Sequence, residues 1–326
     1  LDASFRTPVQ FSPDGNSIFI SLVNPELETL VERHIPVNNR NMDIYSIELA
    51  SGTYKKVVGL PGDDMFIGVT NGKIFWNNIR SEFQVGIQNL QDPDEMRLLD
   101  KNTQLPYWRP DGKRLSVMHG QFRMSEFSLN WDICIYDLNE SNEVISDIQP
   151  FVSGFHEDMG LTWSPDGKWL GYHSHRSNTA VMDYGSEGSR DGLFLMKADG
   201  RDPIELAQDG REISWPKWAP DSKRMIYFKQ DLNYGNRILP YIAQIDHETG
   251  EPEFIKPLHI DGSTGNFMGM TWSPTRPEIA LIEETIPSKE YTIWIVSEDG
   301  DKKNIIFVYE ACPVLSTLDY SPDGDY

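Results

Sequence analysis

The chain lacks several features that would assign it to a functional class at once. It contains no run of about eighteen apolar residues, which excludes a transmembrane helix within these 326 residues. No charged segment followed by an apolar core stands near Leu1, so we expect a mature or trimmed chain without a signal peptide. It also has no Gly-x-Ser-x-Gly elbow, phosphate-binding loop or dinucleotide fingerprint. The sequence therefore offers no ready-made catalytic motif.

Basic residues are scarce relative to acidic ones. The chain has 29 Lys and Arg against 50 Asp and Glu, which gives a formal net charge of −21. Such a charge repels phosphate backbones, and no basic patch offsets it, so we do not expect nucleic-acid binding. The excess acid favours solubility. It also leaves open an acidic surface for cations or for a basic protein partner.

One short phrase is present in seven copies. An aromatic residue precedes Ser-Pro-Asp-Gly or a close variant, as in Trp163-Ser-Pro-Asp-Gly167, and a worn copy reads Val69-Thr-Asn-Gly72. The copies begin at residues 11, 69, 108, 163, 218, 272 and 320. A period of about fifty residues with strand-like content is typical of a radial array of small sheets.

The fourth repeat shows how one unit is built. Met159–Trp163 reads as a strand, Ser164–Gly167 as a tight turn, and Trp169–His173 as the returning strand, followed by strands at Gly192–Lys197 and Pro203–Leu206. Four antiparallel strands per repeat make a propeller blade. We therefore predict an all-β fold, a β-propeller of six four-stranded blades that forms a single domain over residues 1–326, with seven blades as the alternative. The aromatic residue that begins each copy is expected to pack between neighbouring blades.

The repeat resembles the WD40-like (PD40) repeat of TolB-type propellers, whose units read roughly Pro-x-Trp-Ser-Pro-Asp-Gly-Lys. Lys168, Leu170 and Tyr172 match the continuation of that pattern, as do Lys223, Met225 and Tyr227. The resemblance covers essentially the whole chain and implies the fold. It also implies a bacterial periplasmic or extracellular location. The same repeat serves assembly proteins, sugar-degrading lyases and the propellers of serine peptidases, so function has to be argued from the site.

The carboxy-terminal end does not fit a simple count of blades. Six full repeats account for residues 1–312, and 313–326 opens a seventh that stops after its turn. A longer natural chain and a closing strand are both compatible with this pattern, and we favour six blades with a surplus segment. The two cysteines, Cys134 and Cys312, fall in the third and sixth repeats, on opposite sides of a six-blade ring. A disulfide needs Cα atoms within about 7 Å, so we do not expect them to pair.

Long insertions are expected on one side of the blades. The Ser-Pro-Asp-Gly turns join first and second strands, so connections from second to third strands lie on the opposite side, here called the loop side. These connections are irregular in length, and function on a repeat scaffold concentrates where loops vary over a rigid frame. They span residues 23–42, 119–131, 175–191, 229–240 and 283–290.

Polar residues converge on the loop side of the fourth blade. We predict that ligand or partner contacts are made by His156, Asp158, His175, Arg176, Asn178, Tyr184, Lys229 and Glu283. Imidazole is a ligand for Zn²⁺, Mn²⁺ and related ions, so a divalent metal on His156, His173 and His175 is a further hypothesis. His173 and His175 are two apart on a strand and point the same way. The competing interpretation is that these groups hydrogen-bond loop backbone.

Three functions fit these observations. We favour a non-catalytic binding or scaffold propeller of an envelope or secreted assembly, which takes a protein or glycan partner on the loop side. The alternative is a metal-assisted polysaccharide or oligosaccharide lyase, in which a base removes an α-proton and a cation neutralises a uronate carboxylate. The third possibility is the propeller portion of a longer hydrolase, whose nucleophile no residue of 1–326 supplies.

Overall fold

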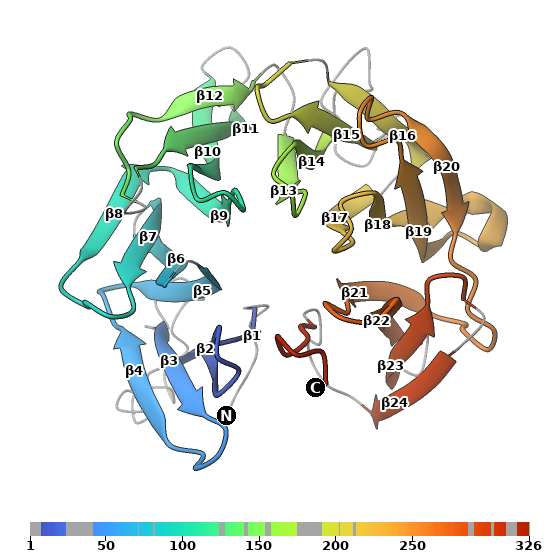
Figure 1. Ribbon diagram of the computed structural model, residues 1–326, viewed down its shortest axis with the longest axis horizontal. Helices are drawn as coiled ribbons and strands as arrows, with labels where there is room; N and C mark the ends of the chain where they lie inside the picture. Colours follow the sequence, from blue (N-terminus) through green and yellow to red (C-terminus); the bar gives the residue numbers. More distant parts are fainter. Residues whose placement is uncertain are drawn as a thin grey trace. The chain divides into compact units, whose positions relative to one another are not determined.

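The computed structural model describes residues 8–23, 42–70, 72–80, 82–123, 128–139, 143–153, 158–174, 191–201, 203–210, 213–285, 290–300, 303–310 and 318–325. Within these ranges the chain forms six four-stranded antiparallel sheets, and in each sheet the strands lie side by side in chain order. Figure 1 shows the six sheets as separate blades. This architecture confirms the all-β, six-bladed β-propeller predicted from the repeats.

The chain divides into two compact units. The first combines Leu1–Pro106 with Thr317–Tyr326, and the second comprises Tyr107–Ser316. The first unit holds blade one and blade two, whose strands are β1 (Gln10–Phe11), β2 (Ser17–Val23), β3 (Met42–Glu48), β4 (Tyr54–Val58), β5 (Asp63–Thr70), β6 (Lys73–Ile79), β7 (Phe83–Asn89) and β8 (Met96–Lys101). Whether the whole chain behaves as one domain stays a prediction.

The second unit holds blades four to six and most of blade three, whose first strand begins in the first unit. Blade three comprises β9 (Thr103–Trp108), β10 (Arg114–Arg123), β11 (Ser128–Asp137) and β12 (Gln149–Val152), and blade four comprises β13 (Asp158–Trp163), β14 (Trp169–Ser174), β15 (Asp191–Lys197) and β16 (Ile204–Gly210). Blade five comprises β17 (Ile213–Trp218), β18 (Arg224–Asp231), the 3-10 turn η3 (Leu232–Tyr234), β19 (Arg237–Ile245) and β20 (Pro252–Pro257). Blade six comprises β21 (Asn266–Trp272), β22 (Glu278–Glu284), β23 (Glu290–Ser297) and β24 (Lys303–Glu310).

The repeated Ser-Pro-Asp-Gly phrase folds as a self-contained turn. In blade four the hydroxyl of Ser164 donates to the carboxylate of Asp166 at 2.7 Å, and the same carboxylate oxygen accepts from the backbone N–H of Lys168 at 3.2 Å. The backbone of Gly167 donates to the carbonyl of Ser164 at 2.8 Å, and its φ of 70° is one that glycine adopts without strain. The Ser-Pro-Asp-Gly sequence therefore stabilises its own turn, because the carboxylate of its aspartate accepts hydrogen bonds from within that turn.

The aromatic residues that begin each copy join neighbouring blades in the second unit. The indole nitrogen of Trp163 donates to the Ser116 hydroxyl of blade three at 2.9 Å. Equivalent bonds run from Trp218 to the carbonyl of Thr162, at 3.3 Å, and from Trp272 to the carbonyl of Lys217, at 3.2 Å. For Trp163, Trp218 and Trp272 the prediction of packing between blades is confirmed, because each of these indoles pairs its polar nitrogen while burying its ring.

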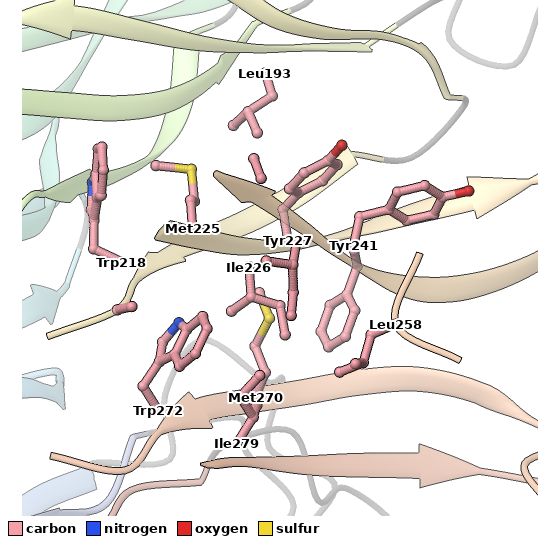
Figure 2. Packing of buried hydrophobic residues seen from close by; sticks show 14 of the residues in the cluster. Leu193, Trp218, Met225, Ile226, Tyr227, Tyr241, Leu258, Met270, Trp272 and Ile279 are labelled. Carbon is pink, nitrogen blue, oxygen red and sulfur yellow. The ribbon is translucent and has the colours of Figure 1, made fainter. Parts of the chain in front are cut away.

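Apolar side chains fill the space between blades five and six. Ile226 and Met225 of β18 are fully buried, and Met270 and Ile279 of blade six complete the same cluster. Figure 2 shows these side chains, with Trp218 and Trp272 beside them. Second strands in this unit are buried on both faces, which explains their almost unbroken apolar sequence.

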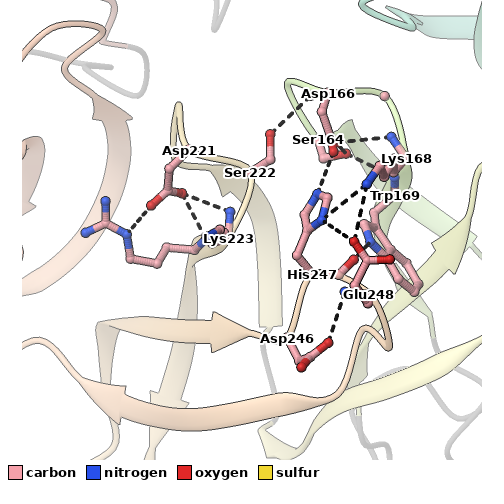
Figure 3. A network of polar contacts seen from close by, with 12 residues as sticks. Ser164, Asp166, Lys168, Trp169, Asp221, Ser222, Lys223, Asp246, His247 and Glu248 are labelled. Atoms are coloured by element: carbon pink, nitrogen blue, oxygen red, sulfur yellow. Dashed lines mark hydrogen bonds and ion pairs between the residues drawn. The ribbon is translucent and has the colours of Figure 1, made fainter.

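A polar network on the turn side joins blades four and five. Nε2 of His247, in the connection from β19 to β20, lies 2.5 Å from Oδ2 of Asp166, and the indole of Trp169 donates to the His247 carbonyl at 3.0 Å (Figure 3). Burial tends to raise the pKa of Asp166, but hydrogen bonds from Ser164, Lys168 and His247 outweigh it and leave the pKa below its ordinary value. These hydrogen bonds therefore join blade four to blade five on the turn side.

The surplus repeat packs against blade one within the first unit. Residues 318–325 form the turn and no strand. A Cβ placed on Gly15 would lie 3.9 Å from Cδ of Pro322, and one on Gly167 of blade four would lie 3.8 Å from Cδ of Pro110 of blade three. The surplus turn thus stands to blade one as the blade-three turn stands to blade four.

Candidate functional site

Five of the predicted contact residues, His156, His175, Arg176, Asn178 and Tyr184, lie outside the described residues. Four other residues, Asp158, His173, Lys229 and Glu283, are described. The proposed contact roles, and the metal role of His156, His173 and His175, stay predictions. Among the residues that the structure describes, no group of three or more His, Cys, Asp or Glu side chains is arranged to hold a metal ion.

Asp158 and His173 are packed into blade four. Asp158 begins β13 and is fully buried directly opposite Ser174 of β14, and His173 is 7% exposed. The pairing register shifts between Met159 and Thr162, which places a bulge around Gly160. Gly160 has a φ of 64°, and a Cβ there would lie 2.5 Å from Nδ1 of His173. Only glycine at position 160 therefore allows the backbone of β13 to pass this close to the imidazole ring of His173.

Glu283 is the best-defined polar residue on the loop side of blade six. It is only 2% exposed. Its Oε1 accepts hydrogen bonds from the Ser263 hydroxyl at 2.9 Å and from the backbone N–H groups of Thr264 and Gly265 at 2.7 and 2.5 Å. Its Oε2 accepts from the indole of Trp294 at 2.7 Å. A buried carboxylate satisfied by several donors holds a loop in one conformation, so these contacts give Glu283 a structural role.

Arg237 holds the same loop from blade five. Its guanidinium donates to the carbonyl of Gly265 at 2.7 Å, to the carbonyl of Ser263 at 3.3 Å and to the Ser263 hydroxyl at 2.7 Å. It also lies 3.7 Å from the Glu283 carboxylate. The connection from β20 to β21 is therefore fastened to two blades at once.

Lys229 lies on the same blade as this loop. Its ammonium stands 5.4 Å from the centroid of the Tyr241 ring, a cation–π distance. The Tyr241 hydroxyl donates in turn to the Asp231 carboxylate. Burial first, and then the neighbouring Asp231, raises the pKa of Tyr241 above its ordinary value. Lys229 is half-buried rather than buried, so it keeps part of its side chain available on the loop side.

The structure also brings together two residues that sequence reasoning missed, Tyr234 and His259. Their ring centroids are 5.2 Å apart, and the Tyr234 hydroxyl lies 3.3 Å from Nε2 of His259. Both side chains are exposed, Tyr234 by 44%. The available sequence signal was the turn itself, because Asp231 and Gly235 bracket Tyr234 as a helix cap and a left-handed terminator. Nothing in the sequence links that turn to a histidine 25 residues away.

The arrangement on the loop side is a rigid frame with exposed loops. Glu283 and Arg237 hold the loop at residues 263–265, while Tyr234 and His259 are exposed and Lys229 is partly exposed. Within the described ranges, no helix is long and apolar enough to cross a membrane.

Comparison with known proteins identifies relatives of this fold. No family model matches the chain. It is 26% identical over 157 residues to the uncharacterized peptidase YuxL of Bacillus subtilis (strain 168). The matched region covers 48% of this chain but only 20% of the length of that protein.

Solved structures resemble the chain more broadly. TolB from Acinetobacter baumannii superposes with a TM-score of 0.53 at 17% identity, over 87% of this chain and 68% of that one. An oligogalacturonate lyase solved with manganese superposes with a TM-score of 0.58 at 13% identity, over 90% of this chain and 77% of that one. Together with the six blades, these similarities show that the chain has the fold of the TolB-type β-propellers, as its repeats predicted.

Proposed function

We propose that this chain is a recognition module, a propeller that binds a protein or glycan partner on the loop side and does no chemistry itself. The observation that carries the proposal is the state of the described polar groups on that side. Glu283 and Arg237 form hydrogen bonds with the loop at 263–265, and His173 is packed on Gly160. Groups used in this way stiffen a platform, and a stiff platform with exposed loops suits binding.

The fold by itself does not choose between binding and catalysis, since both TolB and a lyase have it. For the location we keep the bacterial periplasm or cell exterior, on the basis of the repeat.

The proposal is tested by removing a loop without touching the frame. In one variant, residues 175–190 are replaced by a two-residue Asn-Gly turn, which is suited to joining two antiparallel strands. A matched control, Asp111→Asn, alters one turn on the opposite side. Wild-type and variant proteins with unchanged circular dichroism are then compared on arrays of neutral and anionic polysaccharides, and by quantitative cross-linking in cell-envelope extract.

Binding that is lost in the loop variant and kept in the control supports recognition on the loop side. The lyase alternative is tested in parallel with oligogalacturonate, with and without Mn²⁺, by the ultraviolet absorbance of the unsaturated product. Product formation that disappears in His156→Ala or His175→Ala would replace the binding proposal with the lyase.

A second candidate is the propeller of a longer peptidase. The match to a peptidase over 157 residues favours it, although this chain spans only a fifth of that protein. In such an enzyme the propeller would select substrates for a catalytic domain encoded elsewhere in the same gene. Reading the gene on both sides of the codons for residues 1–326 decides the matter, because an adjoining hydrolase domain with a Gly-x-Ser-x-Gly elbow would establish this candidate.

A further inference from the structure

The exposed ring of Tyr234 stands on a stiff turn. The Asp231 side chain accepts from the backbone N–H of Asn233 at 2.8 Å, and the Asp231 carbonyl accepts from the backbone of Asn236 at 3.0 Å. Gly235 ends the turn with a φ of 74°. A turn closed at both ends holds Tyr234 in place, so its exposure is built in and is not the result of a loose loop.

The partner ring is held with equal firmness. His259 belongs to the connection between β20 and β21, where the backbone of Leu258 donates to the carbonyl of Pro240 at 2.8 Å. Further along the same connection, Ser263, Thr264 and Gly265 are fastened by Glu283 and Arg237 as described above. Two segments from different parts of the chain, each held by its own hydrogen bonds, thus present a tyrosine and a histidine side by side.

The rim of this pair is polar. In the two connections that carry the rings, residues 232–236 and 258–265, the other exposed residues with polar side chains are Asn233, Asn236, Asp261 and Thr264. They supply amide, carboxylate and hydroxyl groups, which can donate and accept hydrogen bonds. The other large exposed apolar side chains for which a strand is described lie on outer strands, Tyr54 on β4, Met96 and Leu98 on β8, Phe254 on β20 and Ile305 on β24. Tyr234 differs from them because it lies on a loop beside a second ring, His259, that is itself exposed.

We propose that the Tyr234–His259 pair is a binding site for a neutral glycan, with the rings contacting the apolar face of a sugar and the polar rim bonding its hydroxyls. This inference rests on the proposed function and names the ligand class of that surface. Three observations favour it. The aromatic area is two rings wide, which is small for a protein interface of about 800 Å² per partner. The rings are preorganised, which lowers the entropic cost of binding. The chain carries a net charge of −21 and the exposed Asp261 is two residues from His259 in the same connection, which disfavours polyanionic sugars.

The test uses the full chain and three neutral polysaccharides, a β-glucan, a xylan and a mannan. Binding is measured by affinity electrophoresis in gels that contain each polymer, and then by calorimetry with hexasaccharides of the polymer that binds. Tyr234→Ala removes the exposed ring. Tyr54→Ala is the matched control, since Tyr54 is 66% exposed on an outer strand and packs edge-on against Tyr45. His259→Ala and His259→Phe separate loss of the supporting ring from loss of its nitrogen.

We expect Tyr234→Ala to weaken binding about tenfold and Tyr54→Ala to leave it unchanged, with His259→Phe closer to wild type than His259→Ala. If wild type binds none of the three polymers, or if Tyr234→Ala binds as tightly as wild type, the glycan site is refuted. The proposed function is judged separately by the variant that lacks residues 175–190. A cross-linked protein partner lost in Tyr234→Ala would overturn the glycan assignment while leaving recognition on the loop side intact.

Discussion

Glu283→Gln is the perturbation that most directly tests how the loop side is held together. The carboxylate accepts three hydrogen bonds from residues 263–265 through Oε1 and one from the Trp294 indole through Oε2. A glutamine keeps one oxygen for the three loop donors, but its amide nitrogen then faces the indole N–H, so two donors meet. The change therefore removes a charge-assisted bond and strands a buried donor.

The magnitude follows from those two losses. A hydrogen bond to a charged group contributes about 1.5–3 kcal/mol, and a buried unsatisfied donor costs about 1–3 kcal/mol. Removing a buried charge offsets part of this. We expect a net loss of about 2–3 kcal/mol in the free energy of unfolding, which corresponds to a fall of roughly 4–12 °C in Tm for a unit of this size.

The assay is urea unfolding and thermal melting of the full chain followed by circular dichroism. The control is Glu284→Gln, the next residue, which is only half-buried and accepts a single bond, from the Tyr291 hydroxyl at 3.0 Å. An amide oxygen can keep that bond, so we expect a change below about 0.5 kcal/mol. If the two variants lose the same small amount of stability, the reasoning about the buried carboxylate is refuted.

Three further predictions follow from other parts of the structure. Burial raises the pKa of Asp64 from 3.8 to about 6, so its contribution to stability is fully present below pH 3.8 and is lost as the pH rises through 6. We expect Asp64→Asn to remove up to about 3 kcal/mol of that pH dependence, measured as unfolding free energy from pH 4 to pH 8, and an unchanged pH profile would contradict this. Trp163→Phe should cost about 1–3 kcal/mol in urea unfolding, because the hydroxyl that pairs with its indole in blade three loses its donor; a shift below about 0.5 kcal/mol would argue that the bond joining the blades is unimportant. Gly86→Ala places a Cβ 2.2 Å from the Trp76 ring, so we expect overpacking of about 1–3 kcal/mol, and a loss of stability below about 0.5 kcal/mol would contradict the close packing; Gly52→Ala, with nothing within 4 Å, should show only the cost of its positive φ, about 1–2 kcal/mol.

The strand pattern could be read from the sequence because it depends on local rules. The turn after each aromatic residue sets where the second strand begins, and the start predicted for the fourth repeat, Trp169, is the one observed. Strand ends were less predictable. The segment 119–131 was expected to be an insertion, but β10 runs to Arg123 and β11 begins at Ser128, so most of it is paired. Polar residues in a hairpin do not by themselves indicate a strand, and whether they pair depends on the partner strand.

The candidate site was less predictable than the fold. Glu283 reads as an exposed rim residue, and only the structure shows that residues 263–265 close over it. Tyr234 and His259 come from separate segments, so their contact depends on how two connections pack. The histidines at 156 and 175 remain a prediction, because they lie outside the described residues.

The sequence by itself determined the blade plan, since a period of about fifty residues, a Pro-Asp-Gly turn and alternating apolar strands act within one repeat. The tertiary structure decided which polar groups form hydrogen bonds inside the fold and which are exposed on its surface. Whether a carboxylate is buried against loop donors, as Glu283 is, or a ring is left exposed, as Tyr234 is, depends on contacts between segments distant along the chain. No local pattern of residues encodes contacts between segments that lie so far apart in the sequence.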